Sequence, residues 1–140
     1  MAINGVSVAI SGLVAATTRL VGSANNIANA QSQGKALNQP LIPDPNAAPD
    51  PGYQPVRTEQ TPVLNGGGTR ANFAPVRPAA VPVFNPDAID ANGEGIVSRP
   101  NVELENEITD QILSVRSFQA NLKTVQTAEE VTKSLLDIKS

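Results

Sequence analysis

The chain has 140 residues, a formal net charge of −3, and neither histidine nor cysteine. The absence of both residue types removes the commonest general base, the thiolate nucleophile and the usual transition-metal ligands. The small net charge and the scattered basic residues argue against nucleic acid as a partner. We therefore expect no enzyme activity: no catalytic residue, no metal, no cofactor, no small-molecule substrate and no nucleic-acid partner.

Large side chains are scarce in this chain. It has no tryptophan, one tyrosine and three phenylalanines, although aromatic residues normally bury about 150–250 Å² each. Much of the remaining apolar content is alanine, which buries little area. Such a chain can form small helix faces but no large private core, and this favours an elongated or multi-chain structure.

The N-terminal segment carries a helical pattern. Apolar or small residues recur there at alternating steps of three and four, at Ile3, Val6, Ile10, Leu13, Thr17, Leu20, Ala24 and Ile27. This spacing places one stripe along a helix over about residues 3–30, and such a stripe is stable only against another helix. Gly12 and Gly22 weaken the isolated helix by about 1 kcal/mol each relative to alanine. We expect Gly34 to follow the helix as its C′ residue.

The same segment does not have the pattern of a cleaved secretion signal or of a membrane span. No basic residue precedes Arg19, and Asn4, Gly5 and Ser7 interrupt the apolar run. A secretion signal has a basic start and an unbroken apolar stretch, and a span needs about 20 apolar residues. We expect mature sequence here, no transmembrane insertion, and another route if the protein leaves the cytoplasm.

The middle segment holds every proline of the chain, from Pro40 to Pro100. Proline breaks helices and favours extended backbone. Strand-like runs at residues 54–64 and 73–76 flank the glycine joint at residues 66–68, and a proline-interrupted third run at 81–84 suits an edge strand. A disordered linker, a small docked β-element and an extended arm all fit this composition.

The C-terminal segment has the signals of a long helix from about Val102 to Ile138. Asn101 is the expected N-cap, and the acidic residues that follow suit the positive end of a helix. Because these acids are spaced by two residues, they fan around the helix and do not converge on a metal. The apolar stripe comprises Leu104, Ile108, Val115, Phe118, Leu122 and Val125, and then moves to Ala128, Val131, Leu135 and Ile138.

Together these patterns predict a mainly α fold. The long N- and C-terminal helices are expected to pair as a coiled-coil-like hairpin. An extended Pro/Gly-rich middle segment, which can hold short β-strands, joins them. The expected divisions are an N-terminal helix segment over residues 1–34, the extended or β segment over 35–100 and a C-terminal helix segment over 101–140.

Three asparagines lie near the end of the first helix, at Asn25, Asn26 and Asn29. Asparagine is a mediocre helix former, so three within five residues call for an explanation. Their amides can satisfy a helix end or pair with neighbouring chains, and an ordinary fraying helix terminus also fits.

Motifs at both ends of the chain resemble the signatures of bacterial flagellar rod and hook proteins. At the N-terminal end these are Ser-Gly-Leu-Val-Ala at residues 11–15, Arg-Leu at 19–20 and Ser-Ala-Asn-Asn-Ile-Ala-Asn at 23–29. At the C-terminal end, residues 116–128, Arg-Ser-Phe-Gln-Ala-Asn-Leu-Lys-Thr-Val-Gln-Thr-Ala, resemble the paired signature, and Pro-Asn-Val-Glu-Leu at 100–104 is similar to its opening.

The short length and the Asp-Ala-Asn-Gly at residues 90–93 are most similar to the proximal-rod members of this family. One departure concerns the Thr-Pro-Gly-Tyr turn that usually follows the asparagine motif. Here residues 31–35 read Gln-Ser-Gln-Gly-Lys, and a Pro-Gly-Tyr occurs later, at 51–53, as though residues were inserted between them.

The resemblance implies a structural role in the flagellar basal body. In this family the terminal helices pair, and subunits stack helically into a tube that crosses the periplasm, transmits torque and lets later subunits pass. Subunits leave the cell unfolded through the flagellar type III export apparatus, without a cleaved signal. The implied partners are copies of this chain, other axial proteins and that apparatus, and a weakly helical, cysteine-free chain suits this route.

We therefore predict a structural subunit of the flagellar proximal rod that assembles through its terminal helices. The alternative is a soluble helical adaptor linked to flagellar or type III export, whose heptads bind one partner helix. The predicted subunit-interface residues are Ile3, Val6, Ile10, Leu13, Leu20, Asn25, Asn26, Ile27, Asn29, Leu104, Ile108, Val115, Phe118, Asn121, Leu122, Val125, Leu135 and Ile138.

Overall fold

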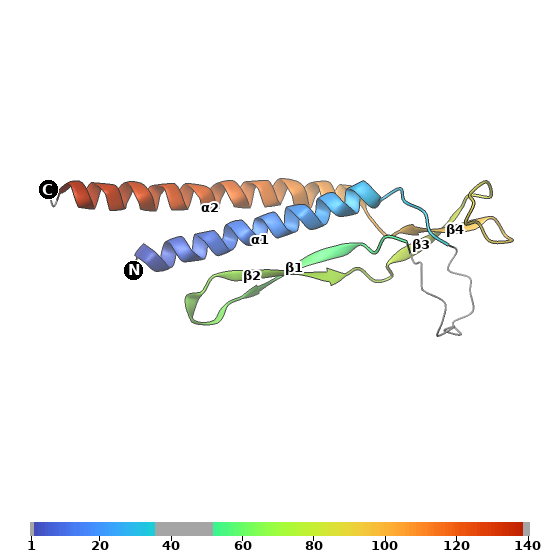
Figure 1. Cartoon of the computed structure of the whole chain (residues 1–140), viewed down its shortest axis with the longest axis horizontal. Helices are drawn as coiled ribbons and strands as arrows, with labels where there is room; N and C mark the ends of the chain where they lie inside the picture. The colour runs from blue at the N-terminus through green and yellow to red at the C-terminus, as the bar shows by residue number, and fades with distance from the viewer. Residues whose placement is uncertain (1, 36–51, 139–140) are drawn as a thin grey trace.

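The computed structural model describes residues 2–35 and 52–138, with side chains from residue 5 onward (Figure 1). Two long helices bracket two short β-hairpins. In chain order the elements are α1 (Ala2–Asn29), β1 (Val56–Pro62), the short 3-10 turn η1 (Leu64–Gly66), β2 (Thr69–Pro75), β3 (Ala80–Phe84), β4 (Ile96–Pro100) and α2 (Leu104–Ile138).

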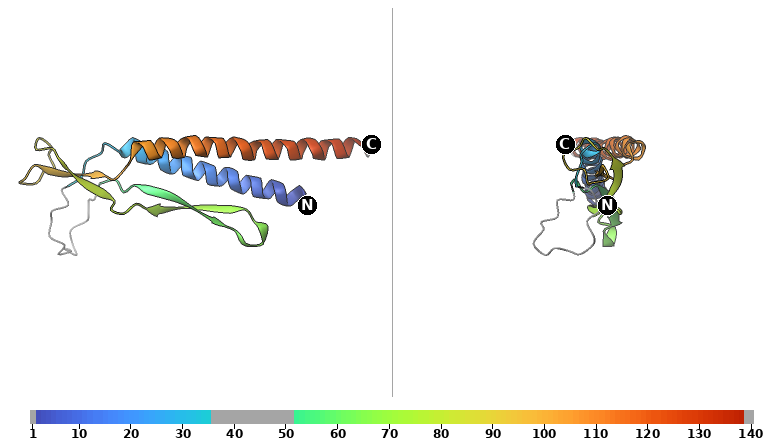
Figure 2. Two further views of the ribbon diagram at one scale, coloured as in Figure 1. Left: turned by 180° about the vertical axis from the view of Figure 1, so that it is seen from behind. Right: turned by 90° about the vertical axis from the view of Figure 1, so that its right-hand side faces the viewer.

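The described part of the molecule is elongated. The helices α1 and α2 lie side by side and run antiparallel, and the β1–β2 hairpin lies along α1 (Figures 1 and 2). The β3–β4 hairpin lies at the end of the molecule away from both termini (Figure 1). At the other end, the C-terminal turns of α2 extend beyond the start of α1 (Figure 1).

The predicted fold class is wrong in the middle of the chain. The paired terminal helices are seen, but with about 53% helix and 21% strand the fold is α+β rather than mainly α. The strands form two antiparallel two-stranded sheets, with Val56 opposite Pro75 in the first and Ala80 opposite Pro100 in the second. Proline is tolerated because each strand of a two-stranded ribbon has a free edge, where a missing N–H removes no ladder bond.

The three strand-like runs are confirmed as β1, β2 and β3. The glycine joint is the turn between β1 and β2, where Asn65, Gly66 and Gly68 have left-handed φ values of 60°, 73° and 86°, a conformation that favours glycine. Strand β4 was not predicted. A docked β-element is thus the alternative that fits the described residues of the middle segment, and residues 36–51 lie outside them.

Two predicted helix ends are wrong. Gly34 is not the C′ residue of α1, which ends at Asn29; instead Gly34 forms an antiparallel bridge with Ser98, with both N–O distances at 3.0 Å. Asn101 is not the N-cap of α2, because its Nδ2 donates to the carbonyl of Pro78 at 3.0 Å. The carbonyl of Glu103 accepts the first helical bonds of α2.

One helix of the described residues is long and apolar enough to cross a membrane. Within α1, Gly5–Asn29 reaches a mean hydropathy of 1.4, so the prediction that this segment lacks the length and hydropathy of a membrane span is wrong. The few polar residues near its start do not offset the many valines, isoleucines, leucines and alanines. In the structure this helix packs against α2 and against the β1–β2 hairpin.

The buried apolar residues are small, as the composition predicts. Among the described residues, the buried hydrophobic side chains are Ala9, Ala15, Ala16, Ala30 and Val97, and Pro55 is also fully buried. Most leucines, isoleucines and phenylalanines are at least partly exposed. The packing inside the chain therefore depends on close backbone approach more than on large apolar side chains.

Candidate functional site

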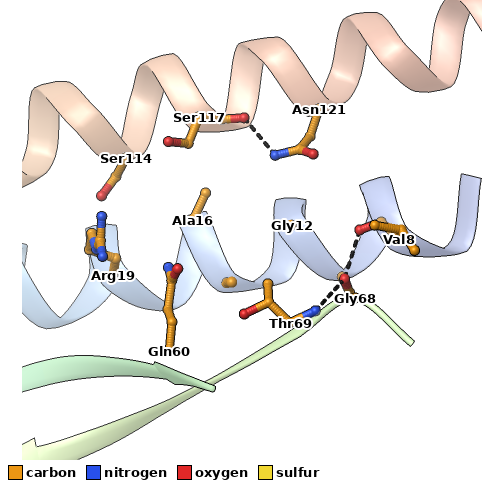
Figure 3. A pocket seen from close by; sticks show the side chains of 12 residues that line it. Val8, Gly12, Ala16, Arg19, Gln60, Gly68, Thr69, Ser114, Ser117 and Asn121 are labelled. Carbon is orange, nitrogen blue, oxygen red and sulfur yellow. Dashed lines mark hydrogen bonds between the residues drawn. The ribbon is translucent and has the colours of Figure 1, made fainter. Parts of the chain in front are cut away.

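A seam of small and polar residues holds the two helices together. In α1, Ala9, Ala16 and Ser23 recur every seven residues and are buried. On α2 the buried Ser114 lies on the side that faces α1, near Arg19 (Figure 3). The Oγ of Ser23 donates to the carbonyl of Glu107 at 2.8 Å, which ties the end of α1 to the start of α2.

Gly12 lets the helices approach closely at the other end of the seam. A Cβ at Gly12 would come within 2.7 Å of the Asn121 side chain, closer than atoms can pack without a shift. The Nδ2 of Asn121 donates to the carbonyl of Ser117 at 2.8 Å, so this amide is folded back onto its own helix (Figure 3). The glycine that weakens α1 as a helix thus leaves room for the Asn121 amide, which would have to move if a Cβ were present.

The β1–β2 hairpin covers a second side of α1. The Oγ of Ser11 accepts a hydrogen bond from the Thr69 backbone N–H at 3.0 Å and donates to the carbonyl of Val8 at 2.7 Å. A Cβ at Gly22 would come within 2.8 Å of the Phe73 ring. Hairpin contacts therefore run along most of α1.

Asn26 joins three parts of the fold and is only 1% exposed. Its Oδ1 accepts from the Val56 backbone N–H at 3.1 Å and from the Tyr53 hydroxyl at 2.9 Å. Its Nδ2 donates to the Val56 carbonyl at 2.7 Å and to Glu107 Oε1 at 2.6 Å. One amide thus connects α1, the start of β1 and the first turn of α2.

Burial raises the pKa of the Tyr53 hydroxyl above its ordinary value of 10.0, and the nearby Glu107 carboxylate raises it further. Both effects disfavour a second negative charge beside Asn26. The neutral hydroxyl is the form that can donate to Asn26.

The large apolar residues of α2 lie mostly outside the seam. Eight of them are between 39% and 52% exposed. Six lie on one side of α2, namely Leu104, Ile108, Ile112, Val115, Phe118 and Leu122, and two, Leu113 and Val131, lie on the other side. In α1, Ile10, Val14 and Val21 are between 47% and 61% exposed. No residue of the described chain covers these side chains fully.

The row of exposed apolar residues on α1 that contains Ile10 and the row on α2 that contains Val115 lie on the same side of the helix pair. One step along a helix is a rotation of about 100°. Ile10 follows the seam residue Ala9 by one position, and Val115 follows the seam residue Ser114 by one position. Because the helices are antiparallel, equal rotations from the seam bring both rows to the same side, which we call the open face.

The hairpin covers the opposite side of α1. Val8, Ala15 and Gly22 each precede a seam residue by one position, and this row carries the contacts to the hairpin. The nine residues of the open face are Ile10, Val14, Val21, Leu104, Ile108, Ile112, Val115, Phe118 and Leu122.

The predicted interface residues have different positions in the structure. Those that are exposed are Ile10, Asn25, Leu104, Ile108, Val115, Phe118, Leu122, Leu135 and Ile138. Those that are half-buried along the seam and its flanks are Val6, Leu13, Leu20, Ile27, Asn29, Asn121 and Val125. Asn26 is buried within the chain, and the side chain of Ile3 lies outside those described.

Some residues of the site were not predicted. The prediction from heptad spacing named the large apolar positions and omitted the row of small seam residues, Ala9, Ala16 and Ser23. The row was visible in the sequence as small residues spaced by seven, which is a signal for close helix packing. Tyr53 and Glu107 carry no local signal, because only the fold brings them to Asn26.

Within the described residues, no three acidic, histidine or cysteine side chains converge on a possible metal position. The candidate site is therefore taken to be the open face, a set of apolar side chains on one side of the helix pair.

Comparison with known proteins agrees with this geometry. Residues 94–138, from the β3–β4 hairpin through α2, match the family model described as flagellar basal body rod FlgEFG protein C-terminal. The flagellar basal-body rod protein FlgC of Yersinia enterocolitica is 33% identical over 136 residues, which are 96% of this chain and 92% of the relative. The chain belongs to the flagellar basal-body rod protein family.

Other relatives extend the comparison. FlgC of Aquifex aeolicus is 28% identical over 133 residues, 91% of this chain and 90% of the relative. The flagellar hook protein FlgE of Borreliella burgdorferi is 37% identical over 46 residues, which are 33% of this chain and 10% of the relative. The predicted resemblance is confirmed: the chain is a structural rod subunit of the flagellar basal body and assembles with other axial proteins.

Proposed function

We propose that the chain is a proximal-rod subunit that assembles helically, through its open face, with copies of itself and with other axial proteins. The rod crosses the periplasm, transmits torque and forms the wall of the channel through which later subunits pass. One observation carries the proposal. Small residues pack inside the chain, whereas nine large apolar residues stay exposed on one side of the helix pair.

The energy available at the open face fits an assembly with several neighbours. Fully burying an exposed valine, leucine, isoleucine or phenylalanine is worth about 1.5–3 kcal/mol. Since these side chains are roughly half exposed, each offers about 1 kcal/mol, and the face offers on the order of 10 kcal/mol. Association costs about 4–15 kcal/mol. A single pairwise contact is therefore marginal, and a lattice of neighbours is favoured.

Export without a cleaved signal agrees with the position of α1. Removing α1 would remove Ala9, Ala16 and Ser23, which form the α1 half of the seam. It would also remove Asn26 and so break the hydrogen bonds that connect α1, β1 and α2. The weakly helical α1 and the lack of cysteine suit passage of an unfolded chain through the type III apparatus, with helix formation coupled to association afterwards.

The contacts of α1 also favour a structural role over membrane insertion. Ser23 and Asn26 make hydrogen bonds to α2 and β1 that a spanning α1 would give up. A polar group without a partner in the bilayer costs several kcal/mol. The open face is apolar and offers no group for acid–base or nucleophilic chemistry, which supports a protein without enzyme activity, small-molecule substrate or nucleic-acid partner.

A soluble helical adaptor is the rival function, and the purified chain distinguishes the two. A rod subunit should be largely unfolded alone in dilute solution, and should gain helix when mixed with other axial proteins under polymerising conditions. Circular dichroism and hydrogen exchange measure both. An adaptor should instead be a stable helical monomer or dimer that joins no polymer, and that result would overturn the proposal.

A further inference from the structure

Arg19 is the one charged residue of α1 and follows the seam residue Ala16 by three positions, which turns it about 60° from the seam toward the hairpin and away from the open face. It lines a groove of about 400 Å³ between α1, α2 and the β1–β2 hairpin (Figure 3). Arg19 lies four residues after Ala15, which is on the hairpin side of α1, and three residues after Ala16, which is on the side of α2. Its side chain therefore points between the hairpin and α2, which form the two walls of this groove.

The groove gives this cation no counter-charge. Its other polar lining residues, which include Gln60, Thr69, Ser114 and Asn121, are uncharged. Ser114 donates instead to the carbonyl of its own helix at Asp110, 2.6 Å away. Among the described residues Arg19 has no hydrogen bond or ion pair, and the ion pair found there joins Arg57 to Glu59.

A half-buried guanidinium without a partner is unfavourable, because it gives up hydration without gaining a compensating charge or hydrogen bond. Its planar fork of donors suits a carboxylate, which it can bind in a bidentate manner. The groove is large enough for a single side chain and too small for a helix. The complementary group is therefore an acidic side chain.

We propose that this groove receives a glutamate or aspartate side chain from an adjacent axial subunit. The inference rests on the proposed function, since it requires a neighbour on the side of the helix pair opposite the open face. Contacts that join two unlike sides of neighbouring subunits generate open helical polymers wherever the rotation between subunits does not close a ring. The chain, with its net charge of −3, carries suitable groups, such as the exposed Glu129 and Glu130 of α2, which have no partner in the described chain.

The direct test is a zero-length cross-link in isolated basal bodies. Arg19→Lys keeps the charge and introduces an amine, which attacks a carbodiimide-activated carboxylate with release of a urea and leaves an amide bond. Mass spectrometry should find this position joined to a glutamate or aspartate of an adjacent axial subunit. Arg70→Lys, on the exposed strand β2, is the matched control for random cross-linking.

The absence of any such cross-link, or a link only to Asp110 of the same chain, would overturn the proposal. A second variant measures the contribution to assembly. Arg19→Gln should lower the amount of the chain in basal bodies about tenfold or more, while Arg19→Lys should retain most of it. If Arg19→Gln assembles like the wild type, the groove contact is refuted.

This outcome is distinguishable from failure of the proposed function. If only the groove proposal is wrong, a charge placed on the open face, as in Leu122→Asp, should still reduce assembly. If open-face variants also assemble normally, the rod interface itself has been misplaced.

Discussion

The seam and the open face are made from the same two helices but by opposite choices of side chain. The seam uses alanines and serines that are almost fully buried, together with the half-buried Gly12 and Asn121. The open face, on one flank of the seam, carries isoleucine, valine, leucine and phenylalanine and leaves them about half exposed. A chain built to be stable alone would place its large apolar residues inside.

The comparison teaches how a subunit can be ordered in an assembly and weakly ordered outside it. Small seam residues contribute little burial but set a precise geometry through close approach and hydrogen bonds. The larger hydrophobic contribution becomes available only when neighbours cover the open face. Three changes test this division.

The largest effect is expected from charges beside and on the open face. Replacing Leu20 and Leu122 with aspartate should abolish rod assembly and motility, because burying an unpaired carboxylate costs more than these side chains contribute. Swimming and the chain content of purified basal bodies measure the outcome. Thr127→Asp is the matched control, since Thr127 is exposed and turned about 140° around α2 from Leu122. A double variant that swims normally would show that these stripes are not the contacts.

A smaller loss of stability is expected when the hydrogen-bond network of the buried Asn26 is broken. Asn26→Leu leaves the Val56 amide and carbonyl and the Tyr53 hydroxyl without their partner, and each buried unsatisfied group costs about 1–3 kcal/mol. Hydrogen exchange of the Val56 amide in assembled rods should accelerate. Asn25→Leu, the exposed neighbouring position, is the control and should exchange like the wild type. Unchanged exchange in Asn26→Leu would mean that the network does not hold β1 against α1.

The smallest effect concerns Tyr53 at alkaline pH. Its folded pKa is raised above 10.0, so the contribution to stability is complete below pH 10 and is lost as pH rises through the folded value. Assembled rods should therefore lose stability above pH 10, and Tyr53→Phe should remove that step while weakening the fold by about 0.5–1.5 kcal/mol. In polymers of this chain alone, tyrosinate absorbance reports this group alone, because Tyr53 is the single tyrosine and tryptophan is absent. Titration at the ordinary pKa in assembled rods would contradict its burial beside Glu107.

The sequence by itself determined the two terminal helices, the family and three of the four strands. These features depend on local signals: heptad spacing, proline positions, glycine turns and contiguous motifs. Strand β4 was missed because Pro100 and Asn101 have strong helix-start signals, while the pairing of Val97 and Ser98 depends on β3 and Gly34, distant in the chain.

Only the tertiary structure decided which stripe of each helix faces inward. The apolar heptad of α1 predicts a buried face, yet the shape of the Gly12–Asn121 contact and the hydrogen bonds of Ser23 and Asn26 select the small-residue row for the seam. Helical periodicity gives the position of a stripe around a helix but not the surface that covers it. That surface depends on close approach between residues about one hundred positions apart, which no local pattern contains.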